Sequence, residues 1–187
     1  MSDSAKQAID AQHQEREMQR LMAEITELLV THHGGSLSEQ ELDQGIDLLQ
    51  AAYQLARSSH AEQRRKSGEP YFFHPLRVAH LAARNWMGLP SILAALLHDV
   101  VEDTPVTLEQ VRLNFGDEVA LLVNGLTKVE DVELNRGALK QETYRKQILV
   151  AIEDFRVLCL KLWDRVDNLR TIAALRPEKQ VDRKSVV

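Results

Sequence analysis

The sequence predicts an all-helical fold, and three observations support this prediction. Apolar residues recur at helical spacing through most of the chain, and no segment of any length shows the strict alternation of a half-buried strand. The segments Ser38–Glu41 and Thr107–Gln110 both have the form of a capping box, which marks the first turn of a helix. The sequence contains neither a glycine-rich phosphate loop nor a repeat of roughly 20 to 50 residues. A bundle of helices without a sheet is therefore expected.

The composition is typical of one soluble domain. The 187 residues are 44% hydrophobic, which is enough for one well-buried core. The net charge of −5 argues against a nucleic-acid binder, because such proteins usually carry a basic domain or stripe. The N-terminus lacks the apolar region of a signal peptide, and no apolar run approaches the roughly 20 residues of a membrane span. We expect a cytoplasmic protein with neither nucleic acid nor a membrane as its partner.

Two helices are predicted at the N-terminal end. Residues 5–30 alternate charged residues with Leu, Met and Ile at helical spacing, and a glycine pair at 34 and 35 ends this amphipathic helix. A second helix begins after Ser38 and extends to about His60. The N-terminal helix either packs on the main domain or forms a surface for a partner. The predicted organisation is an N-terminal helix and turn at 1–37, the main domain at 38–180 and a tail at 181–187.

A cationic loop precedes the third predicted helix. Residues 63–70 contain the glycine and proline of a loop, together with three consecutive cations at positions 64–66. Pro75 suits the first turn of a helix, so His74 lies at the helix start. Taken alone, the cations would form a solvated surface, and His74 would cap or pack. Their closeness along the chain favours a shared site instead.

The fourth predicted helix organises the chain. Residues 92–101 are apolar on nearly every side of a helix, which is typical of a buried helix. Its C-terminal end carries four ionisable residues, which pair on two helical faces at i and i+4: His98, Asp99, Glu102 and Asp103. Buried charges are costly unless they are paired or bind a metal. The sequence therefore predicts a cation here, and imidazole with carboxylate suits Mn, Fe or Zn better than calcium.

Four segments follow this predicted cation site. Two short helices are expected at 107–115 and 118–126, and a capping box opens the first of them. The charged, aperiodic stretch 129–139 is expected to form a mobile loop beside the cleft. A helix with an apolar side is expected at 140–153.

The last long helix, 157–175, combines apolar and polar signals. Apolar residues cover most of its surface, so we expect it to be deeply buried. A polar stripe at i, i+3, i+7 and i+10 nevertheless follows one face: Lys161, Asp164, Asn168 and Thr171. An ion pair between Lys161 and Asp164 would explain only the first half of this stripe. A site between this helix and the acidic end of the fourth helix explains all of it.

The order His74, His98-Asp99, Asp164 is similar to that of the HD-domain metal-dependent phosphohydrolases. The sequence motifs around these residues are more specific than their order alone: RKSGEPY at 65–71, AALLHDVVEDT at 94–104, FGDEVA at 115–120, LTK at 126–128 and KLWDR at 161–165. Over roughly residues 40–180 the chain resembles the hydrolase domain of the RelA/SpoT family, which degrades the alarmone (p)ppGpp. The implied fold is an HD-domain helical bundle with an additional N-terminal helix.

The resemblance also implies a role for each matching residue. It makes four residues the ligands of one Mn²⁺ ion: His74, His98, Asp99 and Asp164. It implies that Glu102 and Asp103 are the acidic pair that acts on the attacking water. It assigns the guanosine tetra- or pentaphosphate substrate to Arg65, Lys66, Ser67, Asn168 and Thr171. The implied reaction removes pyrophosphate from the ribose 3′ position and gives GDP or GTP.

Several alternatives stay open at the level of sequence. Trp163 stands where the family usually has a small residue, and it either fills core volume or crowds the pocket; Asp167 stands where the family usually has a histidine. The chain is either a stand-alone hydrolase or a fragment, and its length leads us to expect no synthetase function. Other functions are the hydrolysis of a different nucleotide and a catalytically silent alarmone sensor. The sequence predicts no particular oligomeric state.

Overall fold

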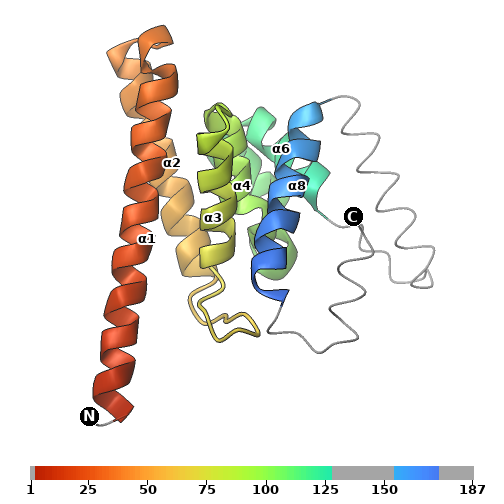
Figure 1. Ribbon diagram of the computed structural model, residues 1–187. Coiled ribbons are helices and arrows are strands. Elements are labelled where there is room, and N and C mark those ends of the chain that lie inside the picture. The colour runs from red at the N-terminus through yellow and green to blue at the C-terminus, as the bar shows by residue number, and fades with distance from the viewer. Residues whose placement is uncertain (1–2, 128–153, 173–187) are drawn as a thin grey trace, which may run out of the picture.

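The computed structural model describes residues 3–127 and 154–172, and all regular structure in these ranges is helical, as predicted (Figure 1). An isolated bridge between Arg64 and Pro70 closes the cationic loop. None of the helices in these ranges has the length and apolar character needed to cross a bilayer. In chain order the helices are α1 (Asp3–His33), the short 3-10 helix η1 (Gly34–Ser36), α2 (Glu39–Ser59), α3 (Phe73–Arg84), α4 (Leu89–Asp103), α5 (Leu108–Phe115), α6 (Asp117–Leu126) and α8 (Phe155–Arg170).

Helix α4 lies at the centre of the bundle. Every residue from Ser91 to Val100 is buried, because α2, α3 and α6 pack around the helix. Pro90 lies in its first turn, where the fixed backbone angle of proline suits a helix start. Helix α8 packs on α3 and also reaches α4. The polar C-terminal end of α4 is therefore held where α3 and α8 approach it.

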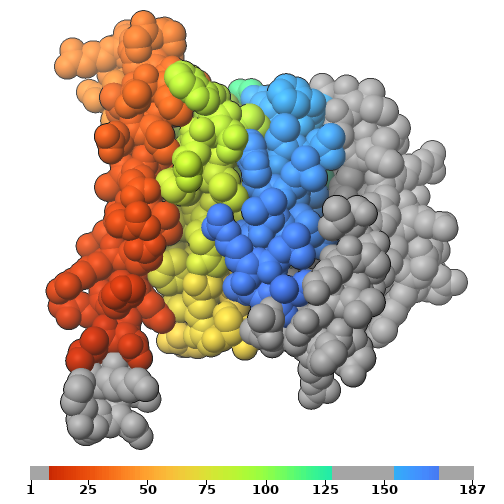
Figure 2. Space-filling view, viewed as in Figure 1, coloured from red at the N-terminus to blue at the C-terminus, as the bar shows by residue number. Residues whose placement is uncertain are grey.

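Helix α1 packs along α3, and its second half belongs to the common core. The buried side chains of this half are Met18, Leu21, Met22, Ile25 and Leu29. Figure 2 shows α1 as a ridge along one side of the molecule. A cleft of about 720 Å³ lies between α1 and α2, lined by residues such as Glu15, Tyr53 and Arg57. None of the residues that line this cleft belongs to the predicted site.

Both predicted capping boxes are present. The backbone N–H of Ser38 donates to the Glu41 carboxylate at 2.8 Å, and the Glu41 N–H donates to the Ser38 hydroxyl at 3.3 Å. The corresponding distances between Thr107 and Gln110 are 2.8 and 3.2 Å. Because these contacts satisfy amide groups that a helix start leaves unpaired, α2 and α5 begin where the sequence predicted.

The expected deep burial of the last helix is wrong. In α8 the buried residues are Val157, Leu160 and Asp167. The large apolar residues that are exposed on it are Phe155, Leu158, Leu162 and Val166. The helix packs on α3 and α6 through one face, and an apolar residue by itself does not reveal whether its face meets the core.

Three predicted segments lie outside the described residues: the loop 129–139, the helix 140–153 and the tail 181–187. The domain boundaries at 37–38 and 180–181 stay predictions.

Candidate functional site

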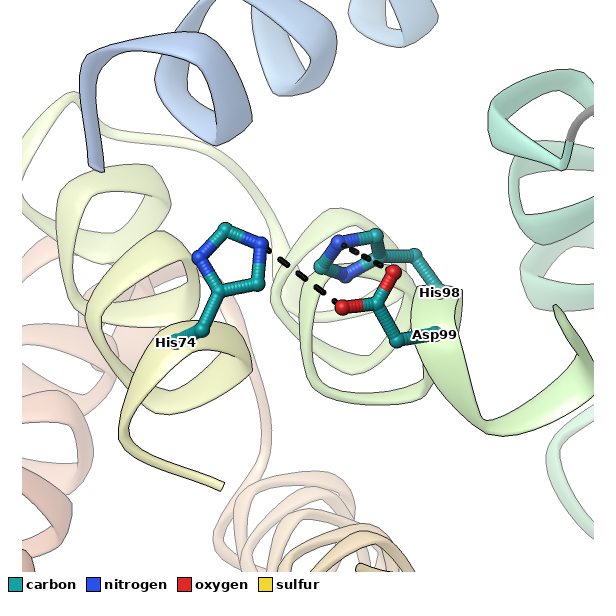
Figure 3. A group of neighbouring side chains, drawn as sticks. All are labelled: His74, His98 and Asp99. Atoms are coloured by element: carbon teal, nitrogen blue, oxygen red, sulfur yellow. Dashed lines mark ion pairs between the residues drawn. The ribbon is translucent and has the colours of Figure 1, made fainter. Parts of the chain in front are cut away.

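Two histidines and an aspartate meet where the start of α3 faces the end of α4 (Figure 3). His74 lies in the first turn of α3, and His98 and Asp99 lie near the end of α4. All three residues are buried, and one potential ligand atom from each lies within 4.8 Å of the other two. Asp99 Oδ2 lies 3.6 Å from His74 Nε2, and Asp99 Oδ1 lies 3.2 Å from His98 Nε2. The structure thus brings three of the four predicted metal ligands together.

The surroundings of His98 fit a bound cation. Its Nδ1 lies 2.8 Å from the carbonyl oxygen of Ala95, so this nitrogen carries the proton and donates it. Its Nε2 therefore presents a lone pair; this atom is buried and has no hydrogen-bond partner within the described part of the chain. The lone pair faces an oxygen of the Asp99 carboxylate, which is also electron-rich. A divalent cation would satisfy both atoms, and this donor set suits Mn, Fe or Zn.

His74 is held between two carboxylates. Its Nδ1 lies 2.8 Å from Asp167 Oδ2, and its Nε2 lies 3.1 Å from Asp164 Oδ1. Burial lowers the pKa of His74, but the hydrogen bonds with Asp164 and Asp167 outweigh burial and raise this pKa to about 9. A metal ion at Nε2 would replace the proton there, while Nδ1–H would still donate to Asp167. A carboxylate behind a histidine ligand is the usual support of a metal site.

The fourth predicted ligand, Asp164, reaches this group from α8. Besides its contact with His74, its carboxylate accepts a hydrogen bond from the Asn168 amide and lies 3.6 Å from Lys161 Nζ. Burial raises the pKa of Asp164, but the hydrogen bond with His74 and the charge of Lys161 lower it well below its ordinary value. Asp164 is therefore ionised, as a metal ligand must be.

The two predicted catalytic carboxylates lie in the last turn of α4. Asp103 is exposed, and the Tyr71 hydroxyl lies 2.9 Å from Asp103 Oδ2 and 3.0 Å from Asp99 Oδ2. The Gln63 side-chain amide donates to the backbone carbonyl of Asp103 at 3.1 Å. Glu102 is half-buried in the same turn. Tyr71 thus joins Asp103 to the group that contains His74, His98 and Asp99.

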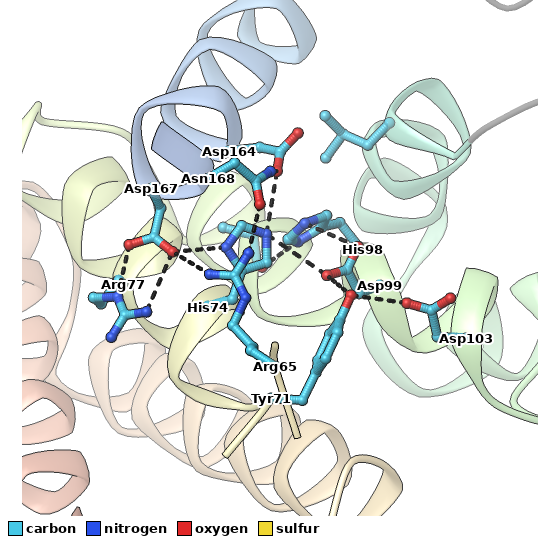
Figure 4. Close-up of polar contacts among 12 residues, drawn as sticks. Arg65, Tyr71, His74, Arg77, His98, Asp99, Asp103, Asp164, Asp167 and Asn168 are labelled. Atoms are coloured by element: carbon cyan, nitrogen blue, oxygen red, sulfur yellow. Dashed lines mark hydrogen bonds and ion pairs between the residues drawn. The ribbon is translucent and has the colours of Figure 1, made fainter. Parts of the chain in front are cut away.

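The cationic loop delivers Arg65 to the same place (Figure 4). The Arg65 side chain is only 10% exposed. Its Nη1 donates to Asp167 Oδ2 at 3.1 Å, and its Nη2 donates to Asn168 Oδ1. Of the predicted substrate-binding residues, the structure therefore places Arg65 and Asn168 in direct contact, one turn of α8 beyond Asp164.

The other predicted substrate-binding residues lie around this contact. Lys66 and Ser67 are exposed at the tip of the loop, where Gly68 has a φ of +87°, a left-handed conformation that glycine adopts without strain. The Gly68 N–H donates to the Arg65 carbonyl at 2.8 Å and closes the turn. Thr171 ends α8, and its hydroxyl donates to the Asn168 carbonyl at 3.4 Å.

Sequence reasoning assigned no role in the site to Tyr71, Arg77 or Asp167. The Asp167 side chain is fully buried, and Arg77 Nε donates to its Oδ1 at 2.6 Å. Burial raises the pKa of Asp167, but hydrogen bonds from His74 and Arg77 outweigh burial and lower this pKa to about 2. One signal was available for two of them: Arg77 and Asp167 each lie three residues from a predicted ligand on the same helix, and such neighbours share a face.

Residues 52–186 match the family model of the HD domain. The chain belongs to the HD-domain family. The matched range of this HD domain contains all four predicted ligands and both predicted catalytic carboxylates.

Known relatives of this HD domain include bacterial and animal proteins. Over 137 residues the chain is 46% identical to the guanosine-3′,5′-bis(diphosphate) 3′-pyrophosphohydrolase of Aquifex aeolicus, covering 73% of this chain and 19% of that protein. It is 42% identical over 136 residues to the bifunctional (p)ppGpp synthase/hydrolase SpoT of Escherichia coli, with coverages of 72% and 19%. The solved structure of a metazoan SpoT ortholog that hydrolyses ppGpp has a TM-score of 0.59 and 33% identity, with coverages of 71% and 77%. The chain thus spans about a fifth of these bacterial relatives, and the resemblance to the RelA/SpoT family is confirmed.

Proposed function

We propose that this HD domain hydrolyses guanosine tetra- and pentaphosphate at the ribose 3′ position, releasing pyrophosphate and GDP or GTP, with Mn²⁺ as its metal ion. One observation carries the proposal. The chain aligns with 77% of the metazoan ppGpp hydrolase, so the HD domain accounts for most of that enzyme. The 46% identity to the A. aeolicus pyrophosphohydrolase adds support from the sequence.

The metal would be held by His74, His98, Asp99 and Asp164. Both imidazoles have Nδ1 next to an oxygen atom, so both offer Nε2 as the ligand. The two aspartates balance the charge of a divalent ion. A divalent ion in such a site lowers the pKa of a water molecule and polarises a phosphoryl oxygen.

Glu102 and Asp103 are the groups that would move protons. A carboxylate within hydrogen-bond reach of the attacking water accepts its proton as the water approaches the phosphorus nearest the ribose. The bond between this phosphorus and the ribose 3′ oxygen breaks, and the 3′ oxygen takes up a proton. With one carboxylate as base and the other as acid, the pair would account for both proton transfers.

The substrate carries dense negative charge, and the protein has a net charge of −5, so local cations must attract it. Arg65 and Lys66 provide them, and a guanidinium also stacks on a base plane. Ser67, Asn168 and Thr171 add hydroxyl and amide groups around the same loop and helix end. These five residues are the proposed nucleotide contacts.

The test is to incubate the purified protein with ppGpp and Mn²⁺ and to identify the products. GDP and pyrophosphate are expected in equal amounts. Glu102→Gln and Asp103→Asn are each expected to lower kcat by about 10²- to 10⁴-fold, the usual contribution of a proton-transfer group, while Mn²⁺ binding persists. Glu39→Gln and Asp43→Asn, at exposed positions of α2, are the matched controls with unchanged kcat.

Other outcomes would overturn the proposal in distinguishable ways. Turnover of a deoxynucleoside triphosphate or a monophosphate, without turnover of ppGpp, would indicate a different nucleotide substrate. Tight binding of ppGpp without any product in the presence of Mn²⁺ would indicate a silent sensor.

A further inference from the structure

We infer that Asp167 is a positioning residue that couples metal binding to nucleotide binding, because it holds His74 and Arg65 on one carboxylate. The inference rests on the function proposed above. The resemblance to known hydrolases assigns no role to this position.

Three donors converge on the Asp167 carboxylate: Arg65 from the cationic loop, and His74 and Arg77 from α3 (Figure 4). Oδ2 accepts hydrogen bonds from His74 Nδ1 at 2.8 Å and from Arg65 Nη1 at 3.1 Å. Oδ1 accepts a hydrogen bond from Arg77 Nε at 2.6 Å. The Asp167 side chain has no exposed area, so water does not replace any of these donors. A carboxylate suits this position because it accepts several hydrogen bonds and donates none.

The shared oxygen ties the two proposed binding functions together. Asp167 Oδ2 holds His74 by Nδ1, which leaves Nε2 for the proposed metal, and the same oxygen holds Arg65, which would contact the nucleotide from the loop. Hydrogen bonds between charged groups are roughly twice as strong as neutral ones, so both side chains are firmly oriented. A shift of Asp167 would therefore disturb the metal ligand and the nucleotide contact at once.

Arg77 and Glu69 hold this arrangement in place. The guanidinium of Arg77 binds the two oxygens of Glu69 at 2.7 and 2.8 Å while it contacts Asp167. The backbone carbonyl of Glu69 in turn accepts the Arg65 N–H at 2.8 Å. Arg65 is thus fixed by its backbone through Glu69 and by its side chain through Asp167. Arg65 and Arg77 balance the charges of Asp167 and Glu69, and Arg170 Nη1 lies 3.7 Å from Asp167 Oδ1, so the network adds no net negative charge next to a phosphate.

A purely structural role for Asp167 makes a different prediction from a coupling role. As the partner of Arg77 alone, Asp167 would contribute to stability. Its loss would then leave the Mn²⁺ affinity of the folded protein and its KM for ppGpp unchanged. As a coupling residue it must affect two separate measurements. These are Mn²⁺ binding without nucleotide and the KM for ppGpp at saturating Mn²⁺.

The test uses Asp167→Asn and Asp167→Ser in the full chain. Asparagine keeps the shape but presents an NH₂ group to one of the three donors, whereas serine is smaller and introduces no steric conflict. For both variants, Mn²⁺ affinity measured by calorimetric titration is expected to fall by about 10- to 100-fold, the usual loss for a support behind a metal ligand. The KM for ppGpp is expected to rise by about tenfold or more, as for a lost charged hydrogen bond.

Asp154→Asn is the matched control on the same helix. Asp154 caps the start of α8 through the Arg156 N–H at 3.0 Å, and asparagine caps equally well. Its Mn²⁺ affinity and KM are expected to equal those of the wild-type protein.

The result that would overturn the inference is a folded Asp167 variant with wild-type Mn²⁺ affinity and wild-type KM. A change in only one of the two quantities would also overturn the coupling. Wild-type protein that does not hydrolyse ppGpp would instead overturn the proposed function, so the two failures are distinguishable.

Discussion

In both histidines of the site, Nδ1 lies 2.8 Å from an oxygen atom that fixes the ring. The partner is the Asp167 carboxylate for His74 and the Ala95 carbonyl for His98. Both Nε2 atoms therefore point toward Asp99 before any ion arrives (Figure 3). Residues outside the set of ligands therefore orient both rings so that Nε2 faces the proposed metal position.

The hydroxyl group of Tyr71 connects the predicted ligand Asp99 to one of the two proposed catalytic carboxylates, Asp103. We expect Tyr71→Phe to lower kcat at saturating Mn²⁺ by about tenfold, the effect of one lost hydrogen bond that orients Asp103. Phenylalanine retains the ring that stacks on His60 at 4.9 Å, so the loop is expected to keep its fold. Steady-state kinetics on ppGpp is the measurement. Tyr53→Phe, in the core of α2, is the control, and equal kcat values for Tyr71→Phe and the wild type would contradict this role.

At the scale of helices, the caps set the starting points of α2 and α5. Ser38→Ala is expected to lower the free energy of unfolding by about 1 kcal/mol, because an alanine cannot accept the Glu41 N–H. Urea denaturation measures this loss. Ser58→Ala, near the end of the same helix, is the control and should have little effect, since alanine is a good helix former. Equal losses in the two variants would show that the capping box contributes nothing specific.

The interface between α1 and α3 carries a histidine that responds to pH. His80 Nε2 lies 3.0 Å from Glu24 Oε2, yet burial lowers the pKa of His80 below its ordinary 6.5, and the charges of Arg84 and Arg20 add to this. The unfolded chain therefore binds this proton more readily than the folded one. The folded state is therefore favoured by neutral His80 above the unfolded pKa. This contribution to the free energy of unfolding is lost as the pH falls through about 6.5 and below.

The corresponding prediction compares wild-type protein with His80→Gln. Between roughly pH 7.5 and pH 5 the wild-type free energy of unfolding should fall by more than that of His80→Gln, because glutamine does not titrate. Urea denaturation at the two pH values gives both changes. Equal changes in the two proteins would exclude His80 as the source.

The helix starts could be predicted from the sequence because their signals are local. The capping boxes at Ser38 and Thr107 need only four residues each, and the buried character of α4 follows from its unbroken apolar run. The exposure of Phe155 and Leu162 on α8 could not be predicted this way, because it depends on which face meets α3 and α6. Trp163, left open by the sequence, packs partly buried against the core.

For the molecule as a whole, the site joins residues that are far apart in the sequence. The predicted ligands rest on a resemblance in motif order, and the structure brings His74, His98 and Asp99 together. Spacing places Asp167 on the same face of α8 as Asp164, but its partners could not be predicted, because Arg65 lies 102 residues and Arg77 lies 90 residues away from it along the chain. No periodicity within one helix reports such contacts. They arise from tertiary packing, of α8 on α3 and of the Arg65 side chain on α8.

The central claim is that the ends of α3, α4 and α8 form one site for a divalent ion. Titration of metal-free protein with Mn²⁺, followed by electron paramagnetic resonance of the free ion, tests it most directly. The account predicts one bound Mn²⁺ per chain in the wild type and a large loss of Mn²⁺ affinity in His74→Ala and in His98→Ala. His13→Ala, at an exposed position of α1, is the control and should bind Mn²⁺ as the wild type does. Wild-type protein that binds no Mn²⁺, or histidine variants that bind it as tightly as the wild type, would contradict the account.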